Sequence, residues 1–340
     1  MNKMLLPLLL CLLLIMSACG PSTPPDSSPS AETTKQSQVV FYFDTVVTMT
    51  VYTNDEQLLS DAAKECHRYE QLLSKTVEGS DVWNINHANG KRVPVSDETR
   101  YLIEQALEFS RISDGRFDIT IDPCTSLWDF TGENAGVLPD ADALATAASK
   151  VDWTKIDIND EGVLLPVGMS IDLGAIAKGY ISDHIAEFLE NRGVKSGLLN
   201  FGGNVRSIGG KPDGSHWRVG IQDPEGIRDQ SIVGVVSLIG ESVVTSGIYE
   251  RGFTLDGVCY HHILDPETGW SVQNELAGIS IITENACTAD ALSTTVFTMG
   301  LAEGKAFIES LDGVDAIFVT KDGEVSWTSG LADRFTLNLS

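Results

Sequence analysis

The chain has 340 residues, of which 42% are hydrophobic and only 6 are cysteine, a composition typical of a globular protein rather than a fibrous or disordered one. It carries 23 Lys and Arg against 48 Asp and Glu, which gives a formal net charge of −25. This acidic balance argues against nucleic acid or anionic lipid as the main electrostatic partner, because both are bound through an excess of basic residues. An anionic ligand would need a local exception, such as a helix N-terminus or a metal ion.

The N-terminal residues have the features of an export signal. An apolar run over residues 5–15 is too short for a comfortable membrane span. The next segment, MSAC, ends at Cys19 and resembles the lipobox of bacterial lipoproteins, in which the cysteine is lipidated. The alternative is a simple secretory signal with an incidental cysteine. We expect a signal peptide over 1–18, a Pro/Ser-rich disordered tether over 19–38, and a lipid anchor on the extracytoplasmic face of the cell membrane.

Residues 39–340 contain no second linker and are expected to form one domain. The β-branched and aromatic run 39–52 predicts a strand or a bent pair of strands. Apolar residues recur at helical spacing over 57–74, and Ser96 is placed to cap a second helix. Two more helices are expected over 175–191 and 289–300, with short strands over 197–201, 217–221, 232–238, 278–282, 316–320 and 334–339. Strands separated by turns in some places and by helices in others predict an α+β fold with mixed sheets and packed helices.

Four cysteines lie in this domain, Cys66, Cys124, Cys259 and Cys287. Their spacing matches no zinc or redox motif. The sequence is equally compatible with one or two disulfides and with four buried thiols.

Two segments carry residue patterns that suit a phosphate ligand and a cation. In IDLGAIAKGY, an apolar strand ends at Asp172 and two glycines bracket the start of a helix, whose unpaired amides can receive an anion with Lys178 close by. The alternative is that Asp172 only caps the helix. In TADALSTT, Asp290 and Thr294 stand four residues apart, so a helix places their oxygens on one face, as a Mg²⁺ site requires. The alternative is an aspartate that favours the helix dipole beside a packed threonine.

Three further segments have weaker signals. His262 precedes the Asp-Pro-x-Thr-Gly turn, and a near-neutral pKa would let it act as an acid or a base, although a lone histidine is more often structural. Its neighbour His261 is expected to point to the other face of its strand. The segment DGRFDIT contains Arg116 and can equally be a turn with one buried ring, and NFGGN is a Gly-Gly turn after an apolar strand.

Taken in order, these segments resemble the ApbE-type FAD:protein FMN transferases. The resemblance covers about residues 43–311 and is carried by IDLGAIAKGY, NFGGN, TSGIYER, HHILDPETG and TADALSTTVFTMG. It implies a T-fold-like α/β arrangement and a Mg²⁺-dependent reaction. In that reaction FAD is cleaved at its pyrophosphate, AMP leaves, and FMN is joined through a phosphoester to a Thr or Ser of a target protein.

The resemblance also implies roles for individual residues. Asp290, Thr294 and the carbonyl of Ala175 correspond to Mg²⁺ ligands, and His262 corresponds to a histidine beside the reacting phosphate. The implied FAD contacts are Phe43, Arg116, Phe117, Asp118, Asp172 and Lys178. The chain departs from the family pattern in two places, because Phe43 replaces a common methionine and Thr76 stands near a usual flavin-stacking aromatic. Ser80 and Asn86 keep the family's Ser-x5-Asn spacing.

Two other functions remain open at this point, a metal-dependent FAD pyrophosphatase that releases FMN and AMP, and a non-catalytic FAD- or solute-binding lipoprotein. The resemblance suggests acceptors among extracytoplasmic redox proteins, namely the Rnf complex, the sodium-pumping NADH:quinone reductase and FMN-binding-domain proteins. Residues 163–220 hold 6 basic and 5 acidic side chains, so the acidic excess lies outside the expected pyrophosphate segment. With so many carboxylates elsewhere, an anionic dinucleotide is expected to require Mg²⁺.

Overall fold

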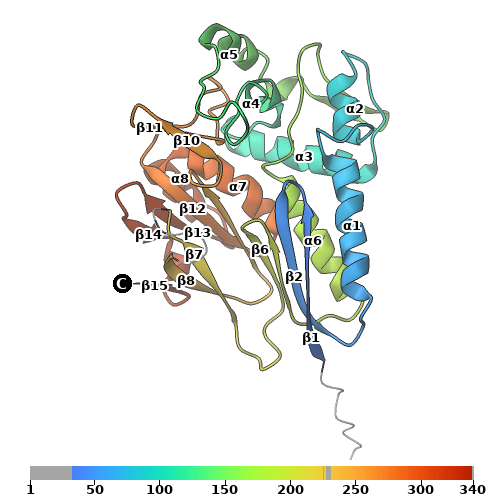
Figure 1. Cartoon of the computed structure of the whole chain (residues 1–340), viewed down its shortest axis with the longest axis vertical. Helices are drawn as coiled ribbons and strands as arrows, with labels where there is room; N and C mark the ends of the chain where they lie inside the picture. The colour runs from blue at the N-terminus through green and yellow to red at the C-terminus, as the bar shows by residue number, and fades with distance from the viewer. Residues whose placement is uncertain (1–32, 225, 227–230, 339–340) are drawn as a thin grey trace, which may run out of the picture. The chain divides into compact units, whose positions relative to one another are not determined.

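The central element of the fold is an eight-stranded sheet (Figure 1). The computed structural model describes residues 33–224, 226 and 231–338. The strand order across the sheet is β1 (Thr34–Tyr42), β2 (Thr45–Thr53), β5 (Gly197–Phe201), β6 (Asn204–Ile208), β9 (Ser242–Gly247), β12 (Leu276–Thr283), β13 (Val314–Thr320) and β14 (Val325–Trp327). The predicted α+β class is confirmed, but each pairing in this sheet is antiparallel where mixed sheets were expected.

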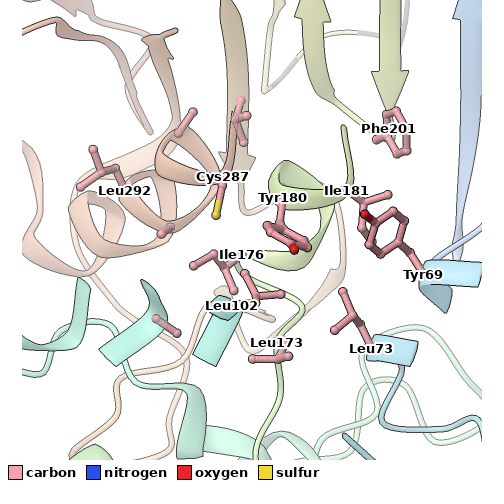
Figure 2. Close-up of a cluster of buried hydrophobic side chains, with 14 of the residues drawn as sticks. Tyr69, Leu73, Leu102, Leu173, Ile176, Tyr180, Ile181, Phe201, Cys287 and Leu292 are labelled. Atoms are coloured by element: carbon pink, nitrogen blue, oxygen red, sulfur yellow. The ribbon is translucent and has the colours of Figure 1, made fainter. Parts of the chain in front are cut away.

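Helices cover one face of the sheet and a small second sheet covers the other. The helices are α1 (Leu58–Leu73), α2 (Asp81–His87), α3 (Asp97–Ile112), α4 (Asp122–Thr125), α5 (Ala141–Ala148), α6 (Ala177–Glu190), α7 (Ala286–Met299) and α8 (Leu301–Glu309). The main core joins inward residues of the sheet, such as Met49 and Phe201, to α1, α3, α6 and α7, and Figure 2 shows part of it. On the outer face, Val243 and Ile317 pack against β7 (Trp217–Gln222), β8 (Ile232–Leu238) and β15 (Phe335–Leu337).

The folded domain begins earlier than the sequence suggested. Strand β1 starts at Thr34, and residues 34–38 pair with residues 49–53 of β2, so the expected tether boundary at residue 38 is wrong by five residues. The reason is that an edge strand tolerates polar residues, and the polar residues at the start of β1 resemble the composition of a linker. Cys19 and the expected signal peptide lie outside the described residues. None of the helices in the described part of the chain combines the length and apolar character needed to span a membrane.

Several expected elements are present with small shifts. The helix expected over 57–74 is α1, and Ser96 caps α3 by accepting a hydrogen bond from the backbone N–H of Thr99 at 3.1 Å. Helix α7 begins three residues before the expected start, where Asn285 accepts a hydrogen bond from the backbone N–H of Thr288 at 2.8 Å. The four cysteines of the domain are all free thiols.

Two tight turns meet at one end of the sheet. Phe43 and Asp44 connect β1 to β2, and Gly202 and Gly203 connect β5 to β6, all four with positive φ as a two-residue hairpin turn requires. A Cβ atom on Gly202 would lie 2.0 Å from the hydroxyl oxygen of Thr45, so only glycine fits there. The NFGGN segment is therefore a hairpin turn that lies against the turn of the neighbouring hairpin.

Candidate functional site

The candidate site is built at the junction of helices α6 and α7. The backbone N–H of Gly179 donates a hydrogen bond of 2.9 Å to Oδ2 of Asp290. A Cβ atom on Gly179 would lie 2.2 Å from the carbonyl oxygen of Ala286 and 2.8 Å from Cβ of Asp290. The second glycine of IDLGAIAKGY is thus the residue that lets the two helices approach closely.

The junction brings Lys178 and Asp290 together. Asp290 is only 4% exposed, and the ammonium of Lys178 lies 3.7 Å from its Oδ1 atom. The same ammonium donates a hydrogen bond of 2.9 Å to the carbonyl oxygen of Gly174. Lys178 therefore places a positive charge beside a buried carboxylate at the start of α6.

Two uncharged oxygens, the Ala175 carbonyl just before α6 and the Thr294 hydroxyl one turn after Asp290 on α7, are free of internal hydrogen bonds in the described part of the chain. Gly179 is in the first turn of α6, where an amide has no partner within the helix, and its N–H donates to Asp290. Within the described chain no donor bonds to the Ala175 carbonyl or to the Thr294 hydroxyl, whereas the neighbouring Thr295 hydroxyl donates to the carbonyl of Ala291 at 2.8 Å. One carbonyl and one hydroxyl are thus available to a ligand.

The donor set fits a hard divalent cation. A carboxylate, a backbone carbonyl and a hydroxyl are oxygen ligands of the kind that Mg²⁺ and Ca²⁺ prefer, and a small ligand set suits Mg²⁺ because it keeps waters and phosphate oxygens. Groups of three or more His, Cys, Asp or Glu side chains that could hold a metal do not occur among the described residues. Asp290 is therefore the only carboxylate among the three candidate metal ligands. The arrangement lacks the thiolate and imidazole ligands of a soft-metal site.

Asp172 lies in a second charged group that the sequence did not reveal. One carboxylate oxygen of Asp172 accepts from the N–H of Gly174 at 2.8 Å, and the other lies 2.8 Å from the ammonium of Lys75. Lys75 also lies 2.5 Å from Oδ1 of Asp122. Burial lowers the pKa of Lys75, but the charges of Asp172 and Asp122 outweigh it, so the pKa is raised and the ammonium stays charged.

Asn86 holds the segment that leads to Asp172. Its side-chain amide donates to the carbonyl of Ile171 at 2.9 Å and accepts from the N–H of the same residue at 2.8 Å. Ser80 caps α2, the helix that carries Asn86, because its hydroxyl accepts a hydrogen bond from the N–H of Trp83 at 2.9 Å. The two residues of the Ser-x5-Asn pattern therefore have structural roles: Ser80 caps α2, and Asn86 on that helix holds the backbone of Ile171 next to Asp172.

The two adjacent histidines have different surroundings. His261 is fully buried, and its Nε2 lies 2.9 Å from the carbonyl of Val272. His262 follows the hairpin of β10 (Gly252–Leu255) and β11 (Val258–His261), and its buried Nδ1 atom has no hydrogen-bond partner among the described residues. Burial, together with the charges of His261, Arg251 and Lys178, lowers the pKa of His262 to about 3, below the near-neutral value expected from the sequence.

The residues of the DGRFDIT segment separate into different environments. Phe117 is 2% exposed and its ring packs against Phe109, as the alternative of a turn with one buried ring predicts. Asp118 caps the 3-10 helix Ile119–Ile121, where Oδ1 accepts from the N–H and hydroxyl of Thr120; burial raises the pKa of Asp118. Arg116 is exposed, as is Asp114 at the start of the segment.

Arg116 borders a polar hollow. The volume of the hollow is about 330 Å³, and its lining includes Arg116, Asp265, Asn274 and Thr298. The hydroxyl of Thr298, near the end of α7, also donates to the carbonyl of Arg116 at 3.3 Å. Arg116 is thus tied to the helix that carries Asp290.

Phe43 sits at the tip of the β1–β2 hairpin. Its backbone N–H donates to Oε1 of Glu70 at 2.8 Å, and its half-buried ring lies 6.3 Å from the ring of Phe201. The structure therefore places Phe43 beside the NFGGN turn. Residues 43, 116, 172, 175, 178, 262, 290 and 294 remain candidates for ligand contact, whereas the side chains of Phe117 and Asp118 are occupied by internal contacts.

Comparisons with known proteins give one consistent result. A model of the ApbE family matches residues 43–318. A FAD:protein FMN transferase of Klebsiella pneumoniae (strain 342) is 36% identical over 294 residues, which cover 85% of this chain and 90% of the relative. One from Treponema pallidum (strain Nichols) is 33% identical over 349 residues, 96% of this chain and 93% of the relative.

Solved structures agree. The ApbE protein of Thermotoga maritima superposes with a TM-score of 0.81 at 32% identity, covering 88% of this chain and 98% of its own. The flavinyl transferase ApbE of Pseudomonas stutzeri, in its apo form, gives a TM-score of 0.80 at 28% identity, covering 91% and 99%. The similarity therefore spans nearly the whole described fold.

Proposed function

The chain belongs to the ApbE family, and from this premise we propose how its residues carry out the reaction of a FAD:protein FMN transferase. The reaction moves the FMN part of FAD to a hydroxyl group of a target flavoprotein. The hydroxyl oxygen attacks the phosphorus of the FMN half, a new P–O bond forms, and the pyrophosphate P–O bond breaks. AMP leaves with the electron pair of that bond.

Asp290, Thr294 and the carbonyl of Ala175 are the proposed Mg²⁺ ligands. The observation that supports this assignment is the hydrogen bond from Gly179 to the buried Asp290, because it joins α7, which carries Asp290 and Thr294, to the start of α6, which the unbonded Ala175 carbonyl precedes. Bound Mg²⁺ would neutralise phosphate charge and stabilise the AMP leaving group. The protein's own part is to hold these three oxygens in place before the substrate arrives.

Lys178 and Asp172 are the proposed contacts on either side of the start of α6. Lys178 supplies a positive charge close to the metal ligands, where it would attract the pyrophosphate. Asp172 is fixed by Gly174 and Lys75, so its carboxylate is oriented without further rearrangement. Here Lys75 and Lys178 face three carboxylates, so a bound cation would supply the further positive charge that an anionic dinucleotide needs in a chain of net charge −25.

His262 is the proposed acceptor of the proton from the attacking hydroxyl. A depressed pKa keeps its imidazole neutral in the free protein, so one ring nitrogen can accept a proton. The negative phosphates of bound FAD oppose the charges of Arg251 and Lys178, and so would raise the pKa of His262 toward a useful value in the complex.

We also propose that the enzyme works outside the cytoplasm. The MSAC segment at Cys19 supports a lipid anchor, and the Pro/Ser-rich run after it supports a tether. The matching acceptors are extracytoplasmic flavoproteins, with the Rnf complex, the sodium-pumping NADH:quinone reductase and FMN-binding-domain proteins as the classes to test.

One assay separates the three functions considered. The purified chain is incubated with FAD, Mg²⁺ and a candidate acceptor, and the acceptor mass and the free nucleotides are measured. An acceptor that gains FMN supports the transferase, whereas free FMN with AMP indicates a pyrophosphatase and unchanged FAD indicates a binding protein. Omitting Mg²⁺ and adding a chelator should stop the transfer.

Asp290→Asn tests the metal assignment, with Asp315→Asn as control. Asp315 is an aspartate of β13 that accepts from the hydroxyl of Thr328 at 2.7 Å, away from the α6–α7 junction. We expect Asp290→Asn to lose transfer and the control to keep it. Transfer by Asp290→Asn at wild-type rate under limiting Mg²⁺ would contradict the assignment.

His262→Ala should slow transfer at saturating FAD while leaving FAD binding nearly intact. Equal losses of FAD affinity and of turnover would instead make His262 a binding or structural residue. FAD affinity is measured by flavin fluorescence without an acceptor, so binding and turnover are read separately.

A further inference from the structure

The α6–α7 junction contains a second hydrogen bond that mirrors the first. The backbone N–H of Cys287 in α7 donates to Oδ2 of Asp183 in α6 at 2.9 Å. The N–H of Gly179 in α6 donates to Asp290 in α7 at the same distance. Each helix therefore gives one backbone amide to a carboxylate of the other, and the two bonds lie about one turn apart along both helices.

Asp183 is itself held by the sheet. Nε of Arg206, in β6, donates to Oδ1 of Asp183 at 3.1 Å, and another guanidinium nitrogen donates to the carbonyl of Ser207 at 2.8 Å. The side chains of Asp183 and Arg206 are 19% and 13% exposed. The pair is thus shielded from water, and it connects the α6–α7 junction to the central sheet.

Asp183 caps a second amide in the first turn of α7, and it does so from another helix. Helix α7 already has an N-cap, because Asn285 accepts the N–H of Thr288. Asp183 adds a bond to a different amide, that of Cys287, and it comes from the neighbouring helix rather than from α7 itself. Its effect is therefore to fix the register of α7 against α6.

This register matters because the proposed metal ligands are divided between the two sides of the junction. Ala175 lies just before α6, whereas Asp290 and Thr294 lie on α7. The bond from Gly179 ends on Asp290, which the metal would also engage. The bond at Asp183 involves no proposed ligand, so it can hold the two helices in place whether or not a cation is bound.

We propose that Asp183, held by Arg206, is a positioning residue that sets the spacing between the Ala175 carbonyl and the two ligands on α7. The inference rests on the proposed metal site. It predicts that removing Asp183 weakens divalent-cation binding by about tenfold or more, the usual cost of losing a group that orients a metal ligand.

The test uses Mn²⁺ as a probe of the site. Binding of Mn²⁺ to the purified full chain, without FAD, is followed by the loss of the free-ion electron paramagnetic resonance signal. The variants are Asp183→Ala, which removes both bonds, and Arg206→Met, which removes the partner. Arg334→Met is the matched control, since Arg334 forms an ion pair with Glu241 at 2.5 Å outside the junction.

Asp183→Ala and Arg206→Met should raise the Mn²⁺ dissociation constant and the Mg²⁺ concentration for half-maximal transfer by similar factors. The transfer rate at saturating Mg²⁺ should change much less. Arg334→Met should change neither the Mn²⁺ dissociation constant nor the Mg²⁺ concentration for half-maximal transfer. Asp183→Asn can still accept from Cys287, so it should recover part of the loss and provides a folded variant if Asp183→Ala is unstable.

The outcomes distinguish this inference from the metal site itself. Wild-type Mn²⁺ affinity in Arg206→Met and in folded Asp183→Ala overturns the positioning role and leaves the metal site intact. A wild-type chain that binds no Mn²⁺, or that transfers FMN in excess chelator, overturns the metal site and this inference with it.

Discussion

Adding one methyl group at Gly179 should separate helices α6 and α7 at the point where the proposed metal ligands meet. In the variant Gly179→Ala, the new Cβ would lie 2.2 Å from the carbonyl oxygen of Ala286, 2.6 Å from its carbonyl carbon and 2.8 Å from Cβ of Asp290. The nearest of these atoms belong to the backbone of a packed helix, so a rotamer change cannot relieve the contact.

The size of the shift follows from these distances. Non-bonded carbon atoms are comfortable at roughly 3.5–4.0 Å, so the helices must move apart by about 1 Å. Overpacking of this kind costs about 1–3 kcal/mol of stability. The same displacement lengthens the 2.9 Å bond from Gly179 to Asp290 and moves Asp290 away from Ala175. A misplacement of about 1 Å in a catalytic constellation costs on the order of 10²-fold in rate.

A second glycine supplies the matched control. Gly304 lies in α8, and a Cβ there would lie 2.5 Å from Cγ1 of Val296 and 3.1 Å from its carbonyl oxygen. Gly304→Ala should therefore destabilise the fold by a similar amount without separating α6 from α7. Stability is measured by urea unfolding, and transfer is measured across a Mg²⁺ titration. Wild-type transfer and Mg²⁺ dependence in folded Gly179→Ala, or an equal loss in Gly304→Ala, would refute the reasoning.

Three further predictions concern other parts of the site. Lys75→Met leaves Asp172 without its cation, so KM for FAD should rise about tenfold with a smaller change in kcat; an unchanged KM would contradict this role. Burial lowers the pKa of His261 from 6.5 to about 4, so this histidine should contribute a stability loss of about 2 kcal/mol between pH 7 and 5, and the lowered pKa of His262 should add a similar loss. His261→Gln should therefore remove about half of the histidine-dependent loss in urea unfolding, and an unchanged pH dependence would count against this. Gly202→Ala should lower stability more than Gly203→Ala. Both glycines have positive φ, but only a Cβ atom on Gly202 would lie within 3 Å of a neighbouring strand. Equal losses of stability in urea unfolding would show that this steric contact does not matter.

The elements that could be predicted are those whose signals are local. Helix α1 has a clear apolar stripe, and α3 has both a stripe and a serine cap. Helix α8 was missed because it follows α7 directly across Gly300, whose positive φ turns the chain without a linker. The β10–β11 hairpin was missed although Asp256 and Gly257 form a two-residue turn with positive φ, and an Asp-Gly pair is a usable hairpin signal.

The individual site residues could be proposed from motifs, but their contacts could not. Gly179 and Asp290 are 111 residues apart, and no periodicity in the sequence indicates that the amide of one bonds to the carboxylate of the other. Lys75 was missed for a similar reason, since a lysine just after a helix normally faces solvent. Its function depends on Asp122, which lies 47 residues away. Pairing across such distances is decided by the packing of whole elements.

The tight junction between α6 and α7 also protects a chemical group that can report on it. Cys287 is 7% exposed, its amide is bonded to Asp183, and burial raises the pKa of its thiol (Figure 2). A buried thiol of this kind reacts with alkylating reagents only when the surrounding structure opens. The labelling rate of Cys287, read by peptide mass, therefore measures how often the two helices part, with Cys259 as a more accessible thiol in the same chain.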